Sequence, residues 1–526
     1  MRNSLNRFRL ALLSLLATLG VVCAISLYSG ILPDISTQSV SAAGGKTIYL
    51  PLLFGSGSTV PSATATPTGI ATATSTLTPT RTKTPTPTTS PSTPPPTEIP
   101  SNGARRVNAP HYDGGPLYFG GIFWFGKVTS SENYSDVRVG YTDSELYVSA
   151  NIIDRRLWYN TNPSSSALTA WDAVTLYLNT DGNTGNKPST HAYKFVAQMN
   201  AWESPRSNWQ AAYQGNGTGW NASSTSFTSE ATWRGAGLND NTNDHGWVAT
   251  FHIPFSSLGL SGPPDGAIWG LGMTLHDRDD ANGTAIPVKI WPETLVTDSP
   301  ETWGQVYFGD PPAYTSPPSS SQSTTTIRNG LNGVTVKDGE VGGHTTCGNG
   351  LDVWSEWGEK NYMGEKQINI QNQDDVADWP CFSKYYITFP LNSVPANKVI
   401  VSASLTMHQF GNAGQGWNPP PYPSWIQVFT LKDNWNESTL NWNNAPLAEQ
   451  DFGGAQADPL STVPPWPGIS VNWDVSSAAA KAYAQGQPLR LVLYSSDRPM
   501  HSGKYFYSSD ADPEGRPTLQ VIWGDP

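Results

Sequence analysis

The chain has 526 residues and a formal net charge of −12 at pH 7, and only 14% of its residues are charged. Globular proteins average about 25% charged residues, so this composition, together with 21 Trp and 49 Gly, is typical of exported all-β proteins. The absence of a basic cluster argues against nucleic acid or an anionic lipid surface as the partner, because both require many Lys and Arg side chains. A neutral, polar ligand fits the composition better.

Residues 1–43 predict either a signal peptide or a membrane anchor. Three arginines precede an uncharged run from Leu10 to Leu32, which is the arrangement that the export machinery recognises. The run exceeds the roughly 7 to 15 apolar residues of a cleaved signal, and about 20 can span a bilayer. Cleavage after Ala42 or Ala43 therefore competes with retention. In both cases we expect the remainder to be extracellular, either secreted or anchored at the cell surface.

Residues 44–102 contain a short apolar island, Thr47 to Phe54, and then a linker of Thr, Ser, Pro and Ala. The linker cannot bury enough apolar surface to fold, so we expect it to be disordered. Its repeated prolines favour the extended polyproline II conformation, at about 3.1 Å per residue, which makes it a semi-rigid spacer on the order of 100 Å.

Residues 103–310 predict a first β-sandwich. Polar and apolar residues alternate through several short segments separated by Gly, Asn and Asp, and no long amphipathic helix interrupts them. Such segments form sheets with one buried and one wet face. The expected strands begin at Val137, Leu146, Ala173, Tyr193, Gly246 and Trp269.

Five sequence blocks follow one another in this region. They are Tyr141-Thr-Asp-Ser-Glu-Leu-Tyr-Val, Trp171-Asp-Ala-Val-Thr-Leu-Tyr-Leu-Asn, Ala192-Tyr-Lys-Phe, Thr274-Leu-His-Asp-Arg-Asp and Trp303-Gly-Gln-Val. Together they resemble family 9 carbohydrate-binding modules, which are β-sandwiches that hold sugar ends between two tryptophans, often beside structural calcium. The resemblance implies that Trp171 stacks on a sugar and that Lys194 stands in the place of the family's arginine.

Tryptophans beside amide side chains also indicate sugar binding on chemical grounds. The apolar face of a sugar lies flat on an aromatic ring, and its hydroxyls bond to amides and charged donors around the edge. We expect Trp171 and Lys194 to bind a polysaccharide or oligosaccharide, with Trp158, Trp202 and Trp291 as further contacts. The alternative for each tryptophan is a place in the core.

Two loops are rich in the hard oxygen ligands that Ca²⁺ requires. One is Asp277-Arg-Asp-Asp-Ala-Asn-Gly and the other is Asp181-Gly-Asn-Thr-Gly-Asn. We expect structural calcium at Asp277, Asp279 and Asp280, and at Asp181 and Asn183. Ordinary turns that these side chains cap are the alternative.

Residues 311–326 are rich in Pro, Ser and Thr and predict a second linker. Residues 327–526 return to alternating strands, with one helix expected from Val475 to Gln485. The predicted fold class is therefore all-β, with two tandem, jelly-roll-like β-sandwiches. We expect the two to fold independently of one another.

The second region carries a further set of motifs. They are Lys360-Asn-Tyr-Met-Gly, Asn434-Trp-Asn-Glu-Ser-Thr-Leu-Asn-Trp, Trp473-Asp-Val, Tyr505-Phe-Tyr-Ser-Ser-Asp and Gly515-Arg-Pro-Thr-Leu-Gln-Val. Together they resemble the DNRLRE type of domain, which is related to family 96 carbohydrate-binding modules. The resemblance implies a second sandwich that binds carbohydrate. Cys347 and Cys381 are the only cysteines outside the leader, and because export exposes them to oxidising conditions we expect a disulfide between them.

No catalytic motif is recognisable. The sequence has no Gly-x-Ser-x-Gly, no His-Glu-x-x-His and no phosphate-binding loop. It predicts a non-catalytic, monomeric, extracellular protein that captures or adheres to glycans, with membrane contact only through an uncleaved N-terminal segment. Two alternatives stay open. One is a structural cell-surface protein that contacts proteins or cell wall, and the other is a glycoside hydrolase or lyase, or an accessory component of polysaccharide breakdown.

Overall fold

The computed structural model describes residues 35–42, 46–53, 103–115, 117, 119–347, 350–373 and 380–526. The expected signal or anchor segment and the expected disordered linker lie mostly outside these residues. Within residues 1–90, which form a unit of their own, β1 (Ile35–Ala42) pairs antiparallel with β2 (Lys46–Leu53), and β2 contains most of the apolar island. None of the described helices is long and apolar enough to cross a membrane.

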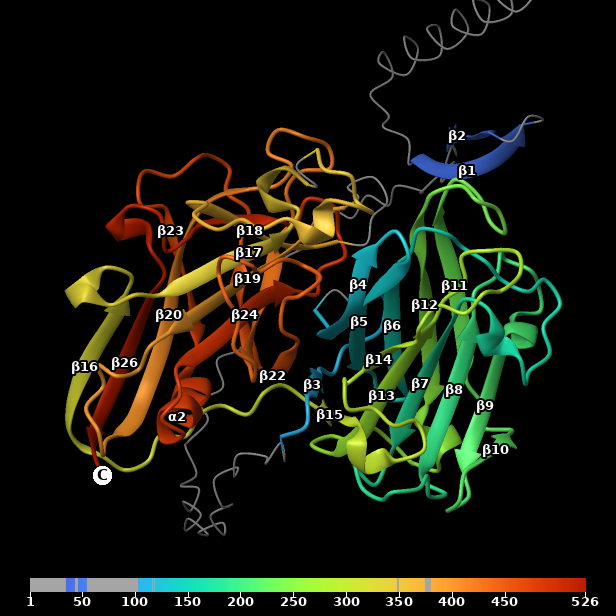
Figure 1. Cartoon of the computed structure of the whole chain (residues 1–526), viewed down its shortest axis with the longest axis horizontal. Coiled ribbons are helices and arrows are strands. Elements are labelled where there is room, and N and C mark those ends of the chain that lie inside the picture. The colour runs from blue at the N-terminus through green and yellow to red at the C-terminus, as the bar shows by residue number, and fades with distance from the viewer. Residues whose placement is uncertain are drawn as a thin grey trace, which may run out of the picture. The chain divides into compact units, whose positions relative to one another are not determined.

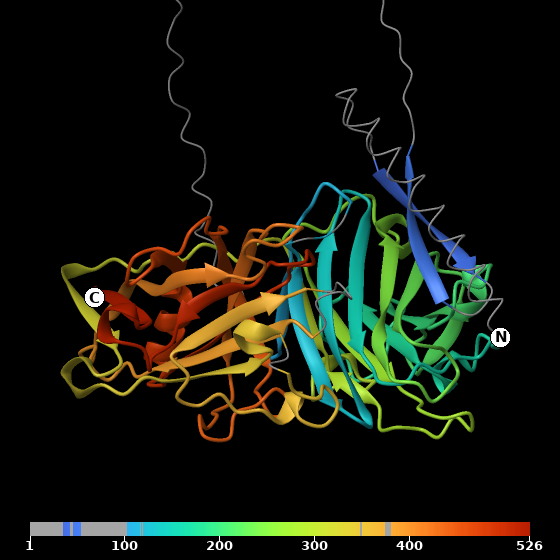
Figure 2. The ribbon, with the colours of Figure 1, turned by 90° about the horizontal axis from the view of Figure 1, so that it is seen from above.

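The first sandwich consists of two sheets (Figures 1 and 2). One sheet is antiparallel, with the order β11-β12-β6-β5-β4. Its strands are β4 (Gly121–Thr129), β5 (Glu132–Tyr141), β6 (Glu145–Ile153), β11 (Thr228–Gly235) and β12 (Asp244–Pro254). Each strand is joined to a neighbour by a ladder of backbone hydrogen bonds, as in β5 and β6, where Val139 lies opposite Val148.

The other sheet runs from β10 through β9, β8 and β7 to β13, which also pairs with β14 and β15. Its strands are β7 (Ala173–Asn179), β8 (Ala192–Gln198), β9 (Gln210–Gly215), β10 (Trp220–Ser223), β13 (Ile268–His276), β14 (Lys289–Trp291) and β15 (Gly304–Phe308). The short strand β3 (Arg106–Ala109) adds to β15 in parallel.

The core of the first sandwich lies between these sheets. In β6, Leu146, Val148, Ala150 and Ile152 are all fully buried, because alternate residues of a strand point to the same face. They belong to the same apolar cluster as Leu176 of β7 in the opposite sheet. The alternation seen in the sequence thus places these side chains in the core.

The second sandwich is also built from antiparallel ladders. One sheet has the order β17-β19-β24-β21-β22, and in the other β20 pairs with β23, β25 and β26. The first sheet comprises β17 (Lys337–Gly342), β19 (Phe382–Phe389), β21 (Ser424–Leu431), β22 (Ala448–Ala457) and β24 (Leu489–Ser495). The second comprises β16 (Ser320–Arg328), β18 (Gln367–Asn372), β20 (Val399–Asn412), β23 (Ile469–Asp474), β25 (Lys504–Tyr507) and β26 (Thr518–Asp525).

The all-β fold of two sandwiches is confirmed, and so is the expected helix, which is α2 (Ser476–Ala484). The expected second linker is shorter than predicted. Strand β16 begins at Ser320 and pairs with β26, with Thr324 opposite Ile522. Its Ser- and Thr-rich sequence suits an exposed edge strand, where polar side chains discourage pairing with other chains.

Part of one sheet of the first sandwich is buried on both faces, where one wet face was expected. Both β5 and β6 are buried along almost their whole length. Trp124 of β4 and Tyr134 of β5 share an apolar cluster with Tyr386, Trp442 and Tyr494 of the second sandwich. The sandwiches therefore meet through a buried aromatic contact, which we call the joint, and the described residues from 103 onward form one compact unit.

Lys384 of β19 lies at the centre of the joint and is 2% exposed. Its Nζ is 3.6 Å from the ring centroid of Trp442 and 4.6 Å from that of Trp124. It is 4.8 Å from the rings of Tyr134 and Tyr494. Aromatic faces attract cations, and they do so more strongly where water is excluded, so these four rings stabilise the ammonium group.

A hydrogen-bonded carboxylate partly offsets the cost of burying the charge of Lys384. The Nζ of Lys384 donates to the hydroxyl oxygen of Tyr134 (2.5 Å). The hydroxyls of Tyr134 and Tyr494 each donate to Asp136 at 2.7 Å. Burial lowers the pKa of Lys384 to about 7, and the charge of Asp136 opposes that shift. The joint thus contains its own counter-charge.

Candidate functional site

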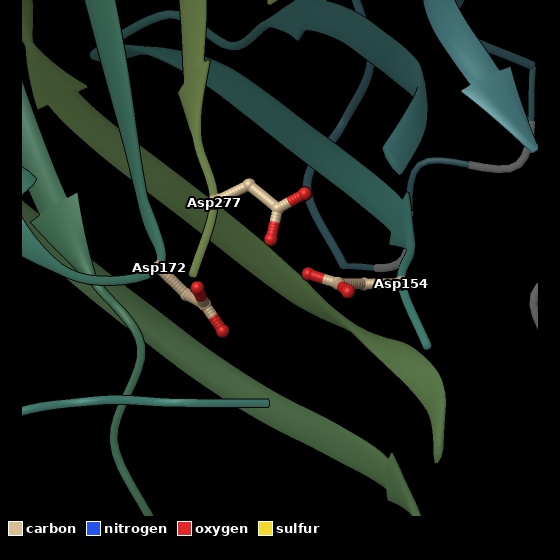
Figure 3. A group of neighbouring side chains, drawn as sticks. All are labelled: Asp154, Asp172 and Asp277. Atoms are coloured by element: carbon tan, nitrogen blue, oxygen red, sulfur yellow. The ribbon is translucent and has the colours of Figure 1, made fainter. Parts of the chain in front are cut away.

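Loops from several strands meet at one end of the first sandwich, which we call the loop end. Asp154 follows the last residue of β6, and Asp172 precedes β7. Because β13 runs antiparallel to β7, with His276 opposite Ala173, Asp277 is placed beside Asp172. Figure 3 shows the three carboxylates pointing toward one another.

These three aspartates form a buried acid cluster. One carboxylate oxygen from each lies within 4.8 Å of the others, and each residue is at most 2% exposed. Asp172 accepts hydrogen bonds from the backbone N–H groups of Trp158 (2.7 Å) and Arg278 (2.9 Å). By contrast, Oδ2 of Asp154 and Oδ1 of Asp277 are buried without a hydrogen-bond partner.

The electrostatics of the acid cluster are unfavourable without a cation. Burial, together with repulsion between the carboxylates, raises the pKa values of Asp154 and Asp172 well above the usual range. Burial and the charge of Asp279 raise the pKa of Asp277 to about 8. The guanidinium of Arg278 is nearby, but it donates to the backbone oxygen of Asp277. This hydrogen bond therefore does not satisfy the unpartnered carboxylate oxygen of Asp277.

The cluster fits a hard divalent cation. Ca²⁺ takes about six to eight oxygen ligands, and buried carboxylates with free lone pairs are the oxygen donors that it prefers. Buried charges are otherwise strongly unfavourable unless they are paired. Asp154, Asp172 and Asp277 could therefore hold Ca²⁺, with the two unpartnered oxygens as its first ligands.

The predicted calcium loops overlap only partly with the acid cluster. Asp277 belongs to it, whereas Asp280 is half-buried and caps a turn by accepting from the N–H groups of Asn282 and Thr284. Asp279 is half-buried and is not part of the cluster.

In the second predicted calcium loop, the protein already uses the expected ligand oxygens. A carboxylate oxygen of Asp181 lies 2.8 Å from Nδ1 of His191. The side-chain oxygen of Asn183 accepts from Nε2 of Gln305 (2.7 Å). This loop is thus held as a turn by contacts within the protein.

Trp158 and Trp171 lie together beside the acid cluster. Their ring centroids are 6.5 Å apart and the rings are 24° from parallel. Trp171 is half-buried, whereas Trp158 is 8% exposed and its indole N–H has no hydrogen-bond partner. Asp172 connects both rings to the cluster, because it follows Trp171 directly and accepts from the backbone of Trp158.

Trp202 is the most open of the predicted sugar contacts. It is 67% exposed, and its ring lies 5.9 Å from that of Trp233, at 40°. Its neighbour Glu203 accepts a hydrogen bond from Tyr159, which joins the two loops that carry Trp202 and Trp158. Trp202 therefore presents an exposed ring in a loop adjoining the tryptophan pair.

Lys194 does not lie with Trp171. It lies on β8 opposite Tyr177 of β7. Tyr177 is four residues beyond Ala173, the first residue of β7 after Trp171, so at about 3.3 Å per residue Lys194 is roughly 13 Å from that end of the strand. Its Nζ lies 4.2 Å from the ring centroid of Tyr213 and 5.3 Å from that of Trp220. Burial lowers the pKa of Lys194.

Trp291 is a core residue rather than a surface contact. It is 2% exposed and stacks on Phe123 with a centroid distance of 4.0 Å. Because no face of its ring is open to a ligand, its expected role in sugar binding is wrong. In the second sandwich, the expected disulfide between Cys347 and Cys381 is confirmed.

Three residues of these sites were not predicted from the sequence. Asp154 and Asp172 complete the acid cluster, and Tyr213 contacts Lys194. The signal that could have found Asp172 is its place directly after Trp171 and before a strand. Asp154 likewise ends a predicted strand, where a carboxylate would otherwise be an ordinary turn residue.

Comparisons with known proteins point to carbohydrate-binding modules. Residues 353–522 match carbohydrate-binding module family 96, which confirms the resemblance of the second sandwich. No curated protein matches the chain.

Among solved structures, the chain is similar to a family 9 carbohydrate-binding module from Caldicellulosiruptor kristjanssonii in complex with cellotriose. The two sequences are 15% identical, the match covers 39% of this chain and 94% of that chain, and the TM-score is 0.28. A family 9 module from the same organism in complex with glucose gives 14% identity, 40% and 99% coverage, and a TM-score of 0.27.

Proposed function

We propose that the chain is a non-catalytic, extracellular carbohydrate-binding protein, and that the loop end of its first sandwich binds a neutral saccharide. The observation that carries this proposal is the pair of Trp171 and Trp158, in which the half-buried ring of Trp171 lies nearly parallel to the buried ring of Trp158. The match of residues 353–522 to a family of carbohydrate-binding modules supports it.

The chemistry of the pair suits a sugar. The half-buried ring of Trp171 offers an apolar surface on which the C–H face of a pyranose can lie. The ring of Trp158 is buried and lies 24° from parallel to that of Trp171, so it supports the position of Trp171 from below the surface. The exposed ring of Trp202 extends the apolar surface to a neighbouring sugar unit.

A divalent cation at the acid cluster would stabilise this site without taking part in sugar chemistry. Bound there, it supplies the positive charge that Asp154, Asp172 and Asp277 lack. Asp172 in turn holds the backbone of Trp158 and fixes the chain after Trp171. The same burial argues against a catalytic role for these carboxylates, because a glycosidic bond would have to reach them.

The test is to measure binding after single ring deletions. A glycan array of neutral oligosaccharides identifies a ligand for the full chain, and isothermal titration then compares wild type with Trp171→Ala. We expect about tenfold weaker binding and a nearly unchanged melting temperature, since one aromatic contact contributes roughly 1 to 1.5 kcal/mol.

Trp220→Ala is the matched control. Trp220 is also a partly exposed tryptophan of the first sandwich, but it lies in the group with Lys194 and Tyr213. We expect it to leave the affinity unchanged. If Trp220→Ala weakens binding and Trp171→Ala does not, the saccharide binds beside Lys194 and the proposed site is wrong.

A further inference from the structure

Three aromatic side chains line up on the outer face of one sheet of the second sandwich. In β25, Lys504 and Phe506 are buried, so Tyr505 and Tyr507 point to the opposite face and are half-buried. Phe410 of the neighbouring strand β20 lies between them. Its ring centroid is 6.1 Å from that of Tyr505 and 4.5 Å from that of Tyr507.

Trp466 continues the row from the loop before β23. Its ring lies 4.8 Å from that of Tyr507, at 62°, and the side chain is 47% exposed. The row of Tyr505, Phe410, Tyr507 and Trp466 is called here the aromatic ridge. None of the four belongs to the apolar cores described above.

The ridge is held in place although it faces solvent. A Cβ atom at Gly515 would lie 2.7 Å from Cη2 of Trp466, so the ring packs directly on that glycine. At the other end, the hydroxyl of Tyr505 donates to the backbone oxygen of Thr345 (2.9 Å). Rings fixed before binding lose little conformational freedom when a ligand arrives, and this favours affinity.

The charges beside the ridge disfavour an acidic ligand. Arg516 donates to the backbone oxygens of Ala511 and Asn329, so its guanidinium is already engaged. Burial lowers the pKa of His408, which keeps this neighbour of the ridge neutral. Asp512 and Glu514 are exposed in the turn before Gly515, and their charges would repel a polyanion.

From these observations we infer that the aromatic ridge is a second glycan-binding surface, and that its ligand is an extended chain of neutral sugars. Sugar rings can pack on the apolar surface that the ridge leaves exposed, above all on the 47% exposed ring of Trp466. All four residues fall within residues 353–522, which match a carbohydrate-binding family. The inference rests on the proposed function in taking carbohydrate as the ligand, but it concerns a different sandwich.

The experiment uses the full chain carrying Trp171→Ala, so that the loop end contributes little. Affinity electrophoresis in gels containing β-glucan, xylan or galactomannan measures retardation by neutral polymers, and polygalacturonate provides the acidic arm. We expect at least one neutral polymer to retard this protein. Adding Trp466→Ala should weaken that binding at least tenfold, and Trp466→Phe, which keeps an aromatic face, should weaken it less.

Trp417→Ala is the matched control, because Trp417 is a 73% exposed tryptophan of the same sandwich outside the ridge. It should leave binding unchanged, and a melting curve should show that each variant is folded. If Trp466→Ala is destabilised, Tyr507→Phe and Tyr507→Ala replace it, with loss expected only for the alanine.

Three results would overturn the inference. They are no retardation by any polymer, equal retardation with and without Trp466→Ala, and Trp466-dependent retardation only by polygalacturonate. Failure of the proposed function looks different. In that case Trp171→Ala alone has no effect on any ligand, while the Trp466-dependent retardation persists.

Discussion

The joint and the loop end are built from the same materials, tryptophans around buried charged groups, yet they differ in how those charges are balanced. In the joint, Lys384 is surrounded by four rings and linked through Tyr134 to Asp136. At the loop end, the carboxylates of Asp154 and Asp277 keep oxygens without any partner. A buried charge that the protein itself balances serves structure, whereas one left unbalanced marks a place for a ligand.

The largest expected effect tests the structural side of this comparison. Trp442 is 4% exposed and contacts Lys384 and Tyr134 in the joint. Trp442→Ala should lower the free energy of unfolding by about 3 to 5 kcal/mol, as deletion of a buried aromatic does. Denaturant unfolding followed by fluorescence measures it.

The exposed Trp417→Ala is the control, and it should change stability by less than about 0.5 kcal/mol. The same curves test whether the sandwiches fold independently, as the sequence predicted. Because the joint is buried, we now expect the two sandwiches to unfold in one shared transition. Two transitions, of which Trp442→Ala shifts only one, would instead show that the sandwiches unfold separately.

A cation should produce the next largest effect. At a hundredfold excess over its Kd, Ca²⁺ would stabilise the folded chain by about 2.7 kcal/mol, which corresponds to a rise of about 3 °C in Tm if both sandwiches, roughly 420 residues, unfold together. Calorimetry in calcium and in EDTA measures the shift. An identical Tm in both would contradict cation binding at the acid cluster.

Asp277→Asn sharpens this test. The amide is close in size to the carboxylate but is a weak cation ligand, so the calcium response should disappear. The Tm in EDTA should not fall, because a buried, unbalanced carboxyl has been replaced by a neutral group. Asp280→Asn, in the capped turn outside the acid cluster, should leave the calcium response intact.

The pH dependence of the joint should be smaller and of defined sign. The pKa of Lys384 is about 7 in the folded chain and about 10.4 when unfolded. Between these values the unfolded chain binds one more proton, so stability rises with pH. From pH 7.5 to 9 the wild type should gain about 2 kcal/mol relative to Lys384→Met.

The comparison between variants removes the contributions of other titrating groups. Lys366→Met, at an exposed lysine, provides the control and should run parallel to wild type. Chemical denaturation at each pH gives the differences. A constant gap between wild type and Lys384→Met would show that Lys384 stays charged throughout, because its rings and Asp136 outweigh burial.

The smallest expected effect concerns the open side of the loop end. Trp202→Ala should weaken binding of a longer neutral oligosaccharide about threefold, or ~0.6 kcal/mol, the low end for an exposed aromatic contact. Binding of a monosaccharide should not change. Titration of both ligands decides whether Trp202 extends the site, and equal loss for both would place Trp202 in the first sugar's contact instead.

The alternation of side chains was sufficient to predict the strands, because burial of one face imposes a period of two on the sequence. The alternation could not predict which strands are buried on both faces. A charged residue in a strand ordinarily indicates a wet face, yet Asp136 of β5 and Lys384 of β19 are both buried in the joint. Only the tertiary contact between the sandwiches reverses that interpretation.

The site was predicted less completely than the fold. Asp154, Asp172 and Asp277 are far apart in sequence, and they meet only because of the register in which His276 lies opposite Ala173. Trp291, expected to contact sugar with a core position as the alternative, lies in a strand of three residues, which is too short to reveal which face each residue occupies. Its ring in fact points into the core.

The buried joint has a consequence for how the chain would engage a polymer. If both proposed surfaces bind glycan, their place in one compact unit makes the second contact intramolecular, so its effective concentration replaces the bulk concentration of ligand. A rigid spacing rewards polymers whose binding stretches match it and gives no avidity for those that cannot reach both surfaces. Selectivity would then depend on the length and shape of the whole polysaccharide, and not only on the sugar that each surface contacts.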